Sequence, residues 1–564
     1  MSTVGGAVAA ETAGPATPGV RKSAAQGGTS GTTMTRTTAA DIASAPFQEA
    51  REKEFQSMID NKVFDIKGRM SPGEARKAGK TIIPAMWVNT WKQPDNLAEP
   101  RKAKARFVAI GLDKFDSRLI ETFNGTPSLD EQRVILIWGV THQKPMGFVD
   151  VKAAFLQAPC AEEDKNILIR MPKLLPKNAK EAGLVEEGLF PIKQALYGLK
   201  NSPRSFGLHF RRQVLEMGFQ ELGMSSYVRV RGRIPKPPML MEPEDDKPRN
   251  VAKAEVTAAL THHVDDVMVV GDPEKELAAL GNRLTIGTYL ILKKGEMRRL
   301  VGMEVTWNQD SIVQSQDHYL DKEDFPVGRT TALTVDSFAP PVEADVDMAI
   351  QAEYRHKIGM MGWLTRTRIE VCYAFSELSR WCATPTPKLL RAVNRVLYHC
   401  KTVASKMVYV RVATPELRIW CDASYDLREK GGRSGWVVQL ADAKWPLEER
   451  RNALTWGTKK EKRKLESTTA AELVASVRAV KAMGALLGPI DVFFGSVPVR
   501  MLLDNAAHVH QMKTGVCASD CSMQGNLNWI RQECERLRVR VERVDTKLQW
   551  ADCLTKWLPS GCLA

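Results

Sequence analysis

The sequence has no long hydrophobic run and no regular cysteine pattern. No apolar stretch approaches the roughly 18 residues that a membrane-spanning helix needs. Ten cysteines are scattered through 564 residues without the spacing of a disulfide framework, and no secretory signal precedes them. These features exclude a disulfide-stabilised secreted domain and indicate a soluble protein with free thiols in a reducing compartment.

The composition is basic and contains enough apolar residues for several cores. The chain has 80 lysines and arginines against 66 acidic residues, a formal net charge of +14, and 43% hydrophobic residues. A chain of this length predicts about three domains. The positive charge favours a polyanionic partner, most commonly nucleic acid.

Two adjacent aspartates, Asp265 and Asp266, lie between two β-prone runs. The apolar run 256–260 precedes them and the run 267–270 follows them, which predicts a hairpin with both carboxylates at its tip. Neighbouring carboxylates repel each other unless a cation lies between them, so a bound divalent metal is one interpretation. The other interpretation is an ordinary aspartate-rich surface turn.

Three segments before this hairpin also contain notable polar residues. Residues 101–109 are basic and then apolar, and their simplest interpretation is a solvated strand edge. Residues 147–156 form an apolar strand that contains Asp150, whose burial is costly unless the carboxylate is paired or bound to a metal. Residues 194–206, punctuated by glycine and proline, predict a loop that leads into a helix.

A second acidic set lies in the C-terminal part of the chain. Asp422 and Asp504 each end an apolar strand, Asp552 lies on a short terminal helix, and Glu472 lies near the start of a helix. Two strand ends and two helices can bring four carboxylates to one point, as a nuclease that binds two Mg²⁺ ions requires. Glu472 has a second interpretation, because Thr469 and Glu472 have the spacing of a capping box.

Histidine and cysteine pairs in the same region invite a zinc interpretation. His508 and His510 are separated by one residue, and Cys517 and Cys521 by three. This spacing fits no zinc finger or knuckle pattern well, so we do not expect zinc here.

Taken in order, these segments resemble the polymerase of copia-type long-terminal-repeat retrotransposons. The likeness runs from about residue 47 to about residue 560, and it rests on segments 104–109 (KARFVA), 149–156 (VDVKAAFL), 196–204 (LYGLKNSPR), 263–266 (HVDD), 295–304 (GEMRRLVGME) and 354–376. The order of the four C-terminal acids resembles the ribonuclease H domain that follows the polymerase in this family. No protease Asp-Thr-Gly motif, integrase acid triad or capsid-like region accompanies them.

The resemblance implies two metal-dependent active sites, each with two Mg²⁺ ions and with Mn²⁺ as the alternative ion. In the polymerase, Asp150 and Asp265 would hold the metals, with Asp266 in support. In the ribonuclease H domain the ligands would be the four acids of the second set: Asp422, Glu472, Asp504 and Asp552.

The resemblance also implies a nucleotide-binding site. Lys104 and Arg106 would bind the triphosphate, Phe155 would lie beneath the sugar, and Tyr197 and Gly198 would line the incoming nucleotide. For Phe155 and Tyr197 ordinary core packing is the alternative.

Three features depart from the family pattern. His263 stands where the family usually has a tyrosine, at a position expected to lie against the primer terminus. Residues 526–531 contain no histidine, although a mobile histidine is often found there. The interval between Asp150 and Asp265 is long, and residues 233–253, rich in proline and charge, predict an inserted surface loop.

We therefore expect an α/β (α+β) chain, with a right-hand polymerase fold of fingers, palm and thumb, a connection, and a ribonuclease H-like domain. The expected boundaries are a disordered low-complexity arm at 1–45, the polymerase at 46–345, the connection at 346–412 and the ribonuclease H-like domain at 413–560.

The function expected from the resemblance is RNA-directed DNA polymerization with cleavage of the RNA strand in RNA–DNA hybrids. The expected partners are an RNA template, a DNA primer and product, hybrid duplex, deoxynucleoside triphosphates and other products of the retroelement polyprotein. The expected location is a cytoplasmic virus-like particle or the nucleus, without a membrane. Two alternatives stay open: a decayed or domesticated copy that only binds nucleic acid, and a free-standing nuclease. The seven intact carboxylates favour the enzyme over the decayed copy.

Overall fold

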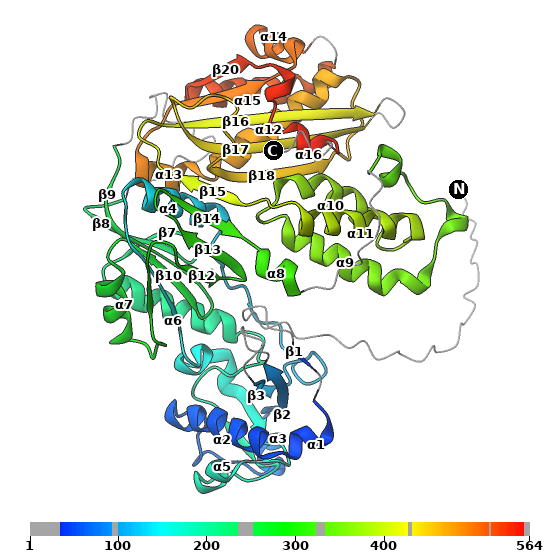
Figure 1. Cartoon of the computed structure of the whole chain (residues 1–564). Helices are drawn as coiled ribbons and strands as arrows, with labels where there is room; N and C mark the ends of the chain where they lie inside the picture. Colours follow the sequence, from blue (N-terminus) through cyan, green and yellow to red (C-terminus); the bar gives the residue numbers. More distant parts are fainter. Residues whose placement is uncertain are drawn as a thin grey trace, which may run out of the picture.

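The computed structural model describes residues 34–35, 37–92, 100–234, 252–322, 333–426, 431–517 and 520–557. Figure 1 shows an N-terminal sheet at the bottom, a central sheet above it, a helical group on the right and a C-terminal sheet at the top. Sheets and helices are mixed throughout, which confirms the predicted α/β fold class. Most of the predicted inserted loop, residues 235–251, lies outside the described residues.

The N-terminal body is a sheet packed against helix α2. Its strands follow the order β1-β2-β5-β6, and β3 pairs with β2. Phe55 of α2 meets Phe107 of β3 edge-on, with 5.6 Å between ring centroids, and both side chains are fully buried. The bounds are β1 Met34–Thr35, β2 Thr81–Lys92, β3 Lys102–Ala109, β5 Ile167–Arg170, β6 Leu189–Pro191, α1 Ala39–Ala43, α2 Ala45–Asp60, α3 Pro72–Lys77 and α5 Lys177–Glu181.

Regular structure begins inside the arm that was predicted to be disordered. Strand β1 pairs with the end of β2, and α1 begins with a capping box. The Thr38 hydroxyl accepts a hydrogen bond from the Asp41 amide at 3.1 Å, and the Asp41 carboxylate accepts one from the Thr38 amide at 2.8 Å. The predicted boundary at residue 45 is therefore wrong for residues 34–35 and 37–45, because local capping and strand pairing offset their low apolar content. Residues 1–33 and 36 lie outside the described residues.

The central body is a sheet in the order β11-β4-β10-β9-β8-β7. Helix α4 begins after Ser128, whose hydroxyl accepts a hydrogen bond from the Asp130 amide at 3.2 Å. Residues 132–140 of α4 are all buried, which explains the almost continuous apolar run there. The bounds are β4 Met146–Asp150, β7 Gln220–Gly223, β8 Ser226–Arg231, β9 Glu255–His263, β10 Asp266–Val270, β11 Leu290–Leu292, α4 Leu129–Thr141, α6 Ser202–Glu216 and α7 Pro273–Gly281.

A small sheet and a helical group link the central and C-terminal bodies. The sheet order is β12-β13-β14-β15, so β15, from the end of the predicted connection, pairs with β14 from the predicted polymerase. The bounds are β12 Met297–Leu300, β13 Met303–Trp307, β14 Ser311–Ser315, β15 Met407–Val410, α8 Asp317–Lys322, α9 Gln351–Leu364, α10 Cys372–Leu378 and α11 Pro387–Thr402.

The C-terminal body is a mixed sheet in the order β18-β17-β16-β19-β20. Strand β16 pairs antiparallel with β17 and parallel with β19, and β19 pairs parallel with β20. The bounds are β16 Pro415–Asp426, β17 Gly431–Asp442, β18 Ala453–Lys460, β19 Val499–Leu503, β20 Val539–Arg543, α12 Thr468–Gly484, α13 Leu487–Phe494, α14 Ala506–Thr514, α15 Gln524–Arg536 and α16 Asp552–Thr555.

One hydrophobic core joins the central and C-terminal bodies. It contains residues of α4, the small sheet and the C-terminal sheet, and Trp138 contacts Phe493 with 5.1 Å between ring centroids. Arg133 of α4 donates hydrogen bonds to the carbonyl oxygens of Leu454 at 2.7 Å and Arg366 at 2.8 Å. Helix α4 is therefore packed between the central and C-terminal sheets.

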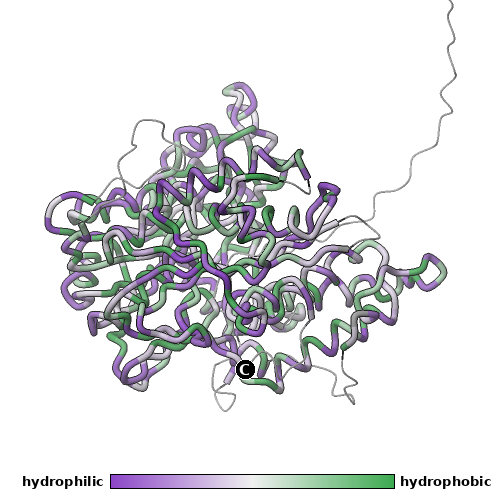
Figure 2. Tube along the Cα trace, turned by 90° about the horizontal axis from the view of Figure 1, so that it is seen from above, coloured by the Kyte–Doolittle hydropathy of each residue, from purple (hydrophilic) through white to green (hydrophobic). Residues whose placement is uncertain are grey.

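Hydrophobic and hydrophilic residues alternate along the tube in Figure 2, as amphipathic elements around shared cores require. No single helix among the described residues is long and apolar enough to span a membrane. One pair of helices, α12 and α13, which are bent relative to each other, would together be long and apolar enough by length and composition only.

Candidate active sites

The first candidate site lies at the tip of the hairpin formed by β9 and β10. Asp266 is paired with His263 across the hairpin, and Val264 and Asp265 form the turn between them. Val264 has a φ of +57°, a conformation that is strained for a β-branched residue. A strained turn held by two paired strands fixes the backbone of Asp265, and so limits where its carboxylate can lie.

Asp150 joins this tip through strand pairing. It is the last residue of β4, and β4 pairs antiparallel with β10 so that Asp150 lies directly opposite Asp266. The Val151 amide donates a hydrogen bond to the Asp265 carbonyl oxygen at 2.8 Å. Three aspartates that are far apart in the sequence therefore share one end of the central sheet.

These carboxylates are electrostatically unfavourable together. Burial, followed by the neighbouring Asp150 and Asp266 carboxylates, raises the pKa of Asp265 to about 7. Desolvation also raises the pKa of Asp150 and of Asp266. Each shift disfavours the ionised form, so a bound cation would relieve the repulsion.

Two basic residues of β3 face the aspartates from the N-terminal body. Lys104 and Arg106 are two positions apart on the strand, so their side chains leave the same face of the sheet. Burial and then the Arg106 charge lower the pKa of Lys104, while Glu54 and Asp265 act in the opposite direction. The Lys104 ammonium group therefore lies within electrostatic reach of the aspartate site.

Aromatic residues lie beside these cations. The Arg106 guanidinium lies 5.1 Å from the Tyr197 ring centroid, and the Tyr197 ring lies 5.2 Å from that of Phe155. Burial raises the pKa of Tyr197 far above its usual range. Phe155 belongs to the short 3₁₀ helix Ala154–Gln157, which follows β4. The structure thus brings together Tyr197, Phe155 and Arg106.

Gly198 allows the Tyr197 loop to approach β3 closely. The Ala109 amide donates a hydrogen bond to the Tyr197 carbonyl oxygen at 2.7 Å. Gly198 has a φ of +88°, and a Cβ atom at this position would overlap the Ala109 carbonyl oxygen. The position therefore requires glycine for both conformation and space.

Glu54 was not found by sequence reasoning. Its carboxylate, on α2, accepts a hydrogen bond from the Phe107 amide at 3.4 Å. Burial raises its pKa, and the charge of Arg106 is the strongest influence in the opposite direction. The sequence does not indicate that Glu54 interacts with Arg106 and with the Phe107 amide, since Glu54 is one of several acids in an ordinary amphipathic helix.

Lys92 and Arg298 are two further charged residues near the aspartates that the sequence analysis did not identify. Both act to lower the pKa of Asp150, and Arg298 does the same for Asp266. Arg298 lies in the segment 295–304 on which the resemblance rests, but nothing in that segment singles it out.

The second candidate site lies in the C-terminal sheet where β19 ends beside β16. The prediction that Asp422 ends its strand is wrong, because pairing with β17 continues β16 to Asp426. Because β16 and β19 are parallel and Trp420 is paired with Leu502, Asp422 and Asp504 follow at matching positions. Asp552 begins α16 nearby. Asp422, Asp504 and Asp552 each have a carboxylate oxygen within 4.8 Å of the others. Among the described residues, this is the one group of three or more aspartate, glutamate, histidine or cysteine side chains whose possible metal-ligand atoms lie this close together.

Glu472 lies within electrostatic reach of Asp422 and Asp504 and does not cap its helix. The cap of α12 is Ser467, whose hydroxyl accepts a hydrogen bond from the Ala470 amide at 3.1 Å. Glu472 lies one turn further on and is buried. Burial, then Asp422 and Asp504, raise its pKa well above the usual range. The capping-box interpretation is therefore wrong, since the preceding serine occupies the cap.

The electrostatics of the second site also suit a cation. Burial, and the charges of Asp552 and Asp504, raise the pKa of Asp422 to about 7, although a hydrogen bond from the Thr555 hydroxyl opposes the shift. One carboxylate oxygen of Asp552 is buried and has no hydrogen-bond partner among the described residues. The other pairs with Lys556 at 2.9 Å, a contact that sequence reasoning did not single out.

Among the residues that the structure describes, the nearby histidines and cysteines belong to no such cluster. His508 is buried and bonded on both ring nitrogens, to the Ser476 hydroxyl at 2.9 Å and to the Gln511 side-chain oxygen at 3.0 Å. The Gln511 side-chain amide donates to the Cys517 sulfur at 3.0 Å. Ser476, His508, Gln511 and Cys517 thus form a buried polar network.

Known proteins resemble this chain in sequence. Residues 74–235 match the family described as "Reverse transcriptase (RNA-dependent DNA polymerase)". The chain is 24% identical over 533 residues to the retrovirus-related Pol polyprotein from transposon RE2 of Arabidopsis thaliana, covering 90% of this chain and 33% of the relative. It is 21% identical over 505 residues to the corresponding polyprotein from transposon TNT 1-94 of Nicotiana tabacum, covering 85% and 35%.

The chain therefore spans about a third of the length of the curated relatives it matches. Among solved structures, a foamy viral protease-reverse transcriptase in complex with RNA/DNA hybrid is 12% identical, with a TM-score of 0.47. That match covers 92% of this chain and 55% of the other.

Proposed function

We propose that this chain, a relative of the copia-type retrotransposon Pol polyproteins, is an RNA-directed DNA polymerase with a ribonuclease H activity. The observation that carries the polymerase proposal is the meeting of Asp150, Asp265 and Asp266 at one sheet end, within electrostatic reach of Lys104 and Arg106. Phosphoryl transfer needs this combination of a cation-binding acid cluster and fixed positive charge.

The acid cluster fits a divalent cation. All three carboxylates have raised pKa values, so binding a cation would replace mutual repulsion by attraction. Two Mg²⁺ ions, with Mn²⁺ as the alternative, would lower the pKa of a primer 3′-hydroxyl and neutralise charge on a leaving pyrophosphate. We assign Asp150 and Asp265 as ligands and Asp266 as their support.

The neighbouring residues would position the nucleotide. Lys104 and Arg106 would bind its triphosphate, and the stacked position of Arg106 on Tyr197 keeps the guanidinium oriented before the substrate arrives. Phe155 would lie beneath the sugar, and the close approach at Gly198 would hold the Tyr197 loop against β3.

A ribonuclease H activity is the second part of the proposal. It is supported by the grouping of Asp422, Asp504 and Asp552 within 4.8 Å, with Glu472 beside them. The unpartnered Asp552 oxygen and the raised pKa of Asp422 suit an Mg²⁺ pair there. The substrate would be the RNA strand of an RNA–DNA hybrid.

The proposed partners follow from these two reactions. They are an RNA template, a DNA primer and product, deoxynucleoside triphosphates and RNA–DNA hybrid, together with other products of the same polyprotein. We propose the polymerase at 46–345, the connection at 346–412 and the ribonuclease H-like domain at 413–560. Action in a cytoplasmic virus-like particle or in the nucleus is part of this proposal.

Primer extension tests the proposal directly. The purified chain is given an RNA template with an annealed DNA primer, the four deoxynucleoside triphosphates and Mg²⁺, and we expect the primer to lengthen. A chain that binds hybrid duplex but extends no primer with either Mg²⁺ or Mn²⁺ would instead support the nucleic-acid-binding alternative.

A further inference from the structure

Arg51 is a buried arginine whose charge is not fully satisfied. It lies on α2, and only 3% of its surface is exposed. One of its terminal guanidinium nitrogens is buried and has no hydrogen-bond partner among the described residues. Burying an unpaired cation costs free energy, so such an arginine needs an explanation.

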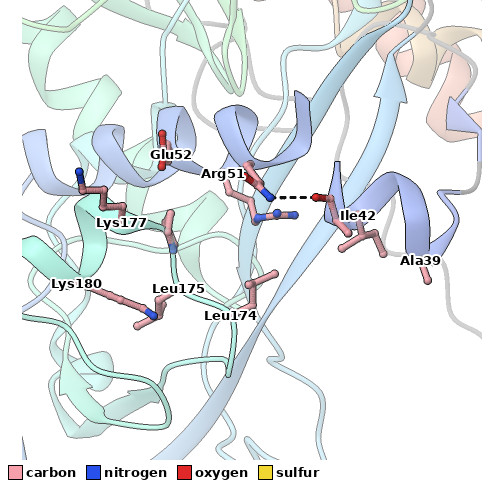
Figure 3. A pocket seen from close by; sticks show the side chains of 11 residues that line it. Ala39, Ile42, Arg51, Glu52, Leu174, Leu175, Lys177 and Lys180 are labelled. Carbon is pink, nitrogen blue, oxygen red and sulfur yellow. Dashed lines mark hydrogen bonds between the residues drawn. The ribbon is translucent and has the colours of Figure 1, made fainter. Parts of the chain in front are cut away.

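Arg51 opens onto a cavity of about 670 Å³ on the N-terminal body. Figure 3 shows the arginine between α2, the α1 segment around Ile42 and the loop that carries Leu174 and Leu175. The loop is held in place by the Trp87 indole, which donates a hydrogen bond to the Leu174 carbonyl oxygen at 2.8 Å. The cavity is thus built by three separate segments of the chain and combines apolar walls with a cation.

The other charges around the cavity do not neutralise Arg51. Lys177 pairs with Glu181 at 3.6 Å and Lys180 with Glu186 at 2.8 Å, so the rim lysines have carboxylate partners of their own. Glu52 also lines the cavity, but consecutive helix positions point about 100° apart. Burial alone lowers the pKa of Arg51, and no carboxylate among the described residues acts in the opposite direction.

We propose that this cavity binds a nucleotide unit, with its phosphate on Arg51 and its base or sugar against Ile42, Leu174 and Leu175. A guanidinium presents paired donors that match phosphate oxygens. The volume lies within the range of small-molecule sites, and the aliphatic side chains of Ile42, Leu174 and Leu175 give an apolar surface for a base or a sugar. The site is distinct from the polymerase centre, because Arg51 lies on α2 among residues of α1 and the 174–180 segment, whereas Asp150 and Asp265 lie at the end of β4 and in the β9–β10 turn.

The chemistry favours a nucleotide over an acidic peptide. The chain carries a net charge of +14, and the same body presents Lys104 and Arg106 to the proposed polymerase site. A nucleotide unit could come from a free mononucleotide or from a single strand of nucleic acid. Both sources share the phosphate that Arg51 would bind, and the experiment separates them.

Hydrogen–deuterium exchange on the full chain, without divalent metal, locates the binding. The probes are inorganic phosphate, adenosine monophosphate and a single-stranded oligonucleotide of about 12 nucleotides. We expect protection of residues 39–52 and 174–180. Protection by the monophosphate indicates a free nucleotide, and protection by the oligonucleotide alone indicates a strand. Absence of protection with every probe would overturn the proposal.

Substitutions connect the protection to Arg51. Arg51→Gln should weaken binding at this cavity about 10-fold or more and remove the protection. The double variant with Lys177→Gln and Lys180→Gln should weaken binding at this cavity less than Arg51→Gln does. Both lysines are exposed, so this variant tests the cavity without disturbing buried structure. Arg76→Gln removes an exposed charge from the same body outside the cavity and should change nothing. Protection that persists unchanged in Arg51→Gln and in the double variant would contradict the assignment.

Discussion

Asp150 and Asp266 face each other directly across the paired strands β4 and β10. One ends its strand and the other begins its strand, so both carboxylates lie at the same end of the central sheet. The turn residue Asp265 completes the group, and its carbonyl oxygen is hydrogen-bonded to the residue that follows Asp150. The proposed metal site therefore depends on strand register as much as on the aspartates themselves.

Asp265→Asn should reduce primer extension by at least about 100-fold, the effect of removing one preorganised charge-stabilising group. The amide is isosteric but cannot supply the negative charge that a divalent cation needs. Extension rates on an RNA template measure the effect. Asp310→Asn, in the exposed turn before β14, is the matched control and should retain activity. Equal activity of Asp265→Asn and the unaltered chain would contradict the assigned role.

Asp422→Asn and Glu472→Gln should each abolish cleavage of hybrid RNA while sparing primer extension. Their carboxylates belong to the C-terminal site and take no part in the aspartate site of the central sheet. Cleavage of labelled RNA in a hybrid and extension of a primer are measured on the same preparations. Glu466→Gln, on an exposed residue just before α12, serves as the control. Loss of extension together with cleavage would argue against two independent sites.

Metal-free stability should fall as pH rises from about 4 toward 7. Asp422 and Asp265 have pKa values of about 7 in the folded chain, whereas an unfolded aspartate ionises near 4. Above pH of about 4 the unfolded state has released protons that the folded state still holds, so higher pH favours unfolding until the folded groups also ionise.

Mg²⁺ should reverse this trend, because it binds the ionised carboxylates. We expect its addition to raise the melting temperature more at about pH 8 than at about pH 6, by about 2 °C or more at the higher pH. Thermal unfolding with EDTA or Mg²⁺ measures the difference, and the variant carrying both Asp422→Asn and Asp265→Asn should show a smaller gain. A gain that is independent of pH and of these substitutions would point to metal binding elsewhere.

Arg133→Met should destabilise the joined central and C-terminal bodies by about 1–3 kcal/mol, because two carbonyl oxygens at the shared core lose their hydrogen-bond donor. Arg133 pairs with Asp130 at 2.8 Å, lies 4.0 Å from the Trp456 ring centroid and bonds to two carbonyl oxygens. Denaturant unfolding measures the loss, and both activities should decline together. Loss of ribonuclease H activity alone, with extension unchanged, would show that the shared core is not cooperative.

Gly198→Ala should impair extension through both strain and steric overlap. The left-handed conformation costs an alanine about 1–2 kcal/mol, and the new methyl group would overlap the Ala109 carbonyl oxygen. We expect the KM for the nucleotide to rise as the Tyr197 loop is displaced. Gly73→Ala is the matched control, since its added carbon would meet no atom within 4 Å. If Gly198→Ala and Gly73→Ala have the same KM for the nucleotide, close approach of the loop at Gly198 is not required for nucleotide binding.

The hairpin around Asp265 was predictable because local chemistry decides it. It follows from two β-prone runs on either side of a short polar turn. The copia-type resemblance, drawn from short motifs, is confirmed by the reverse transcriptase match and the Pol relatives. The predicted end of the N-terminal arm at residue 45 is wrong, because composition does not reveal the strand pairing of β1 with β2.

Glu472 shows where local reasoning ends. Thr469 and Glu472 have capping-box spacing, yet Ser467 caps the helix and Glu472 lies inside it, beside Asp422 and Asp504. Sequence spacing allows both outcomes, and only the packing of α12 against β16 selects one. Glu54 and Arg51 illustrate the same limit, since their neighbours come from strands and loops far along the chain.

The sequence by itself determined the identity and order of the acidic residues and the hairpin at Asp265 and Asp266, because side-chain chemistry and local propensity act over a few residues. The tertiary structure alone decided that Asp150 opposes Asp266, that Gly198 touches Ala109, and that one core joins α4 to the C-terminal sheet. These relationships depend on register and packing between distant segments, and no local pattern encodes them.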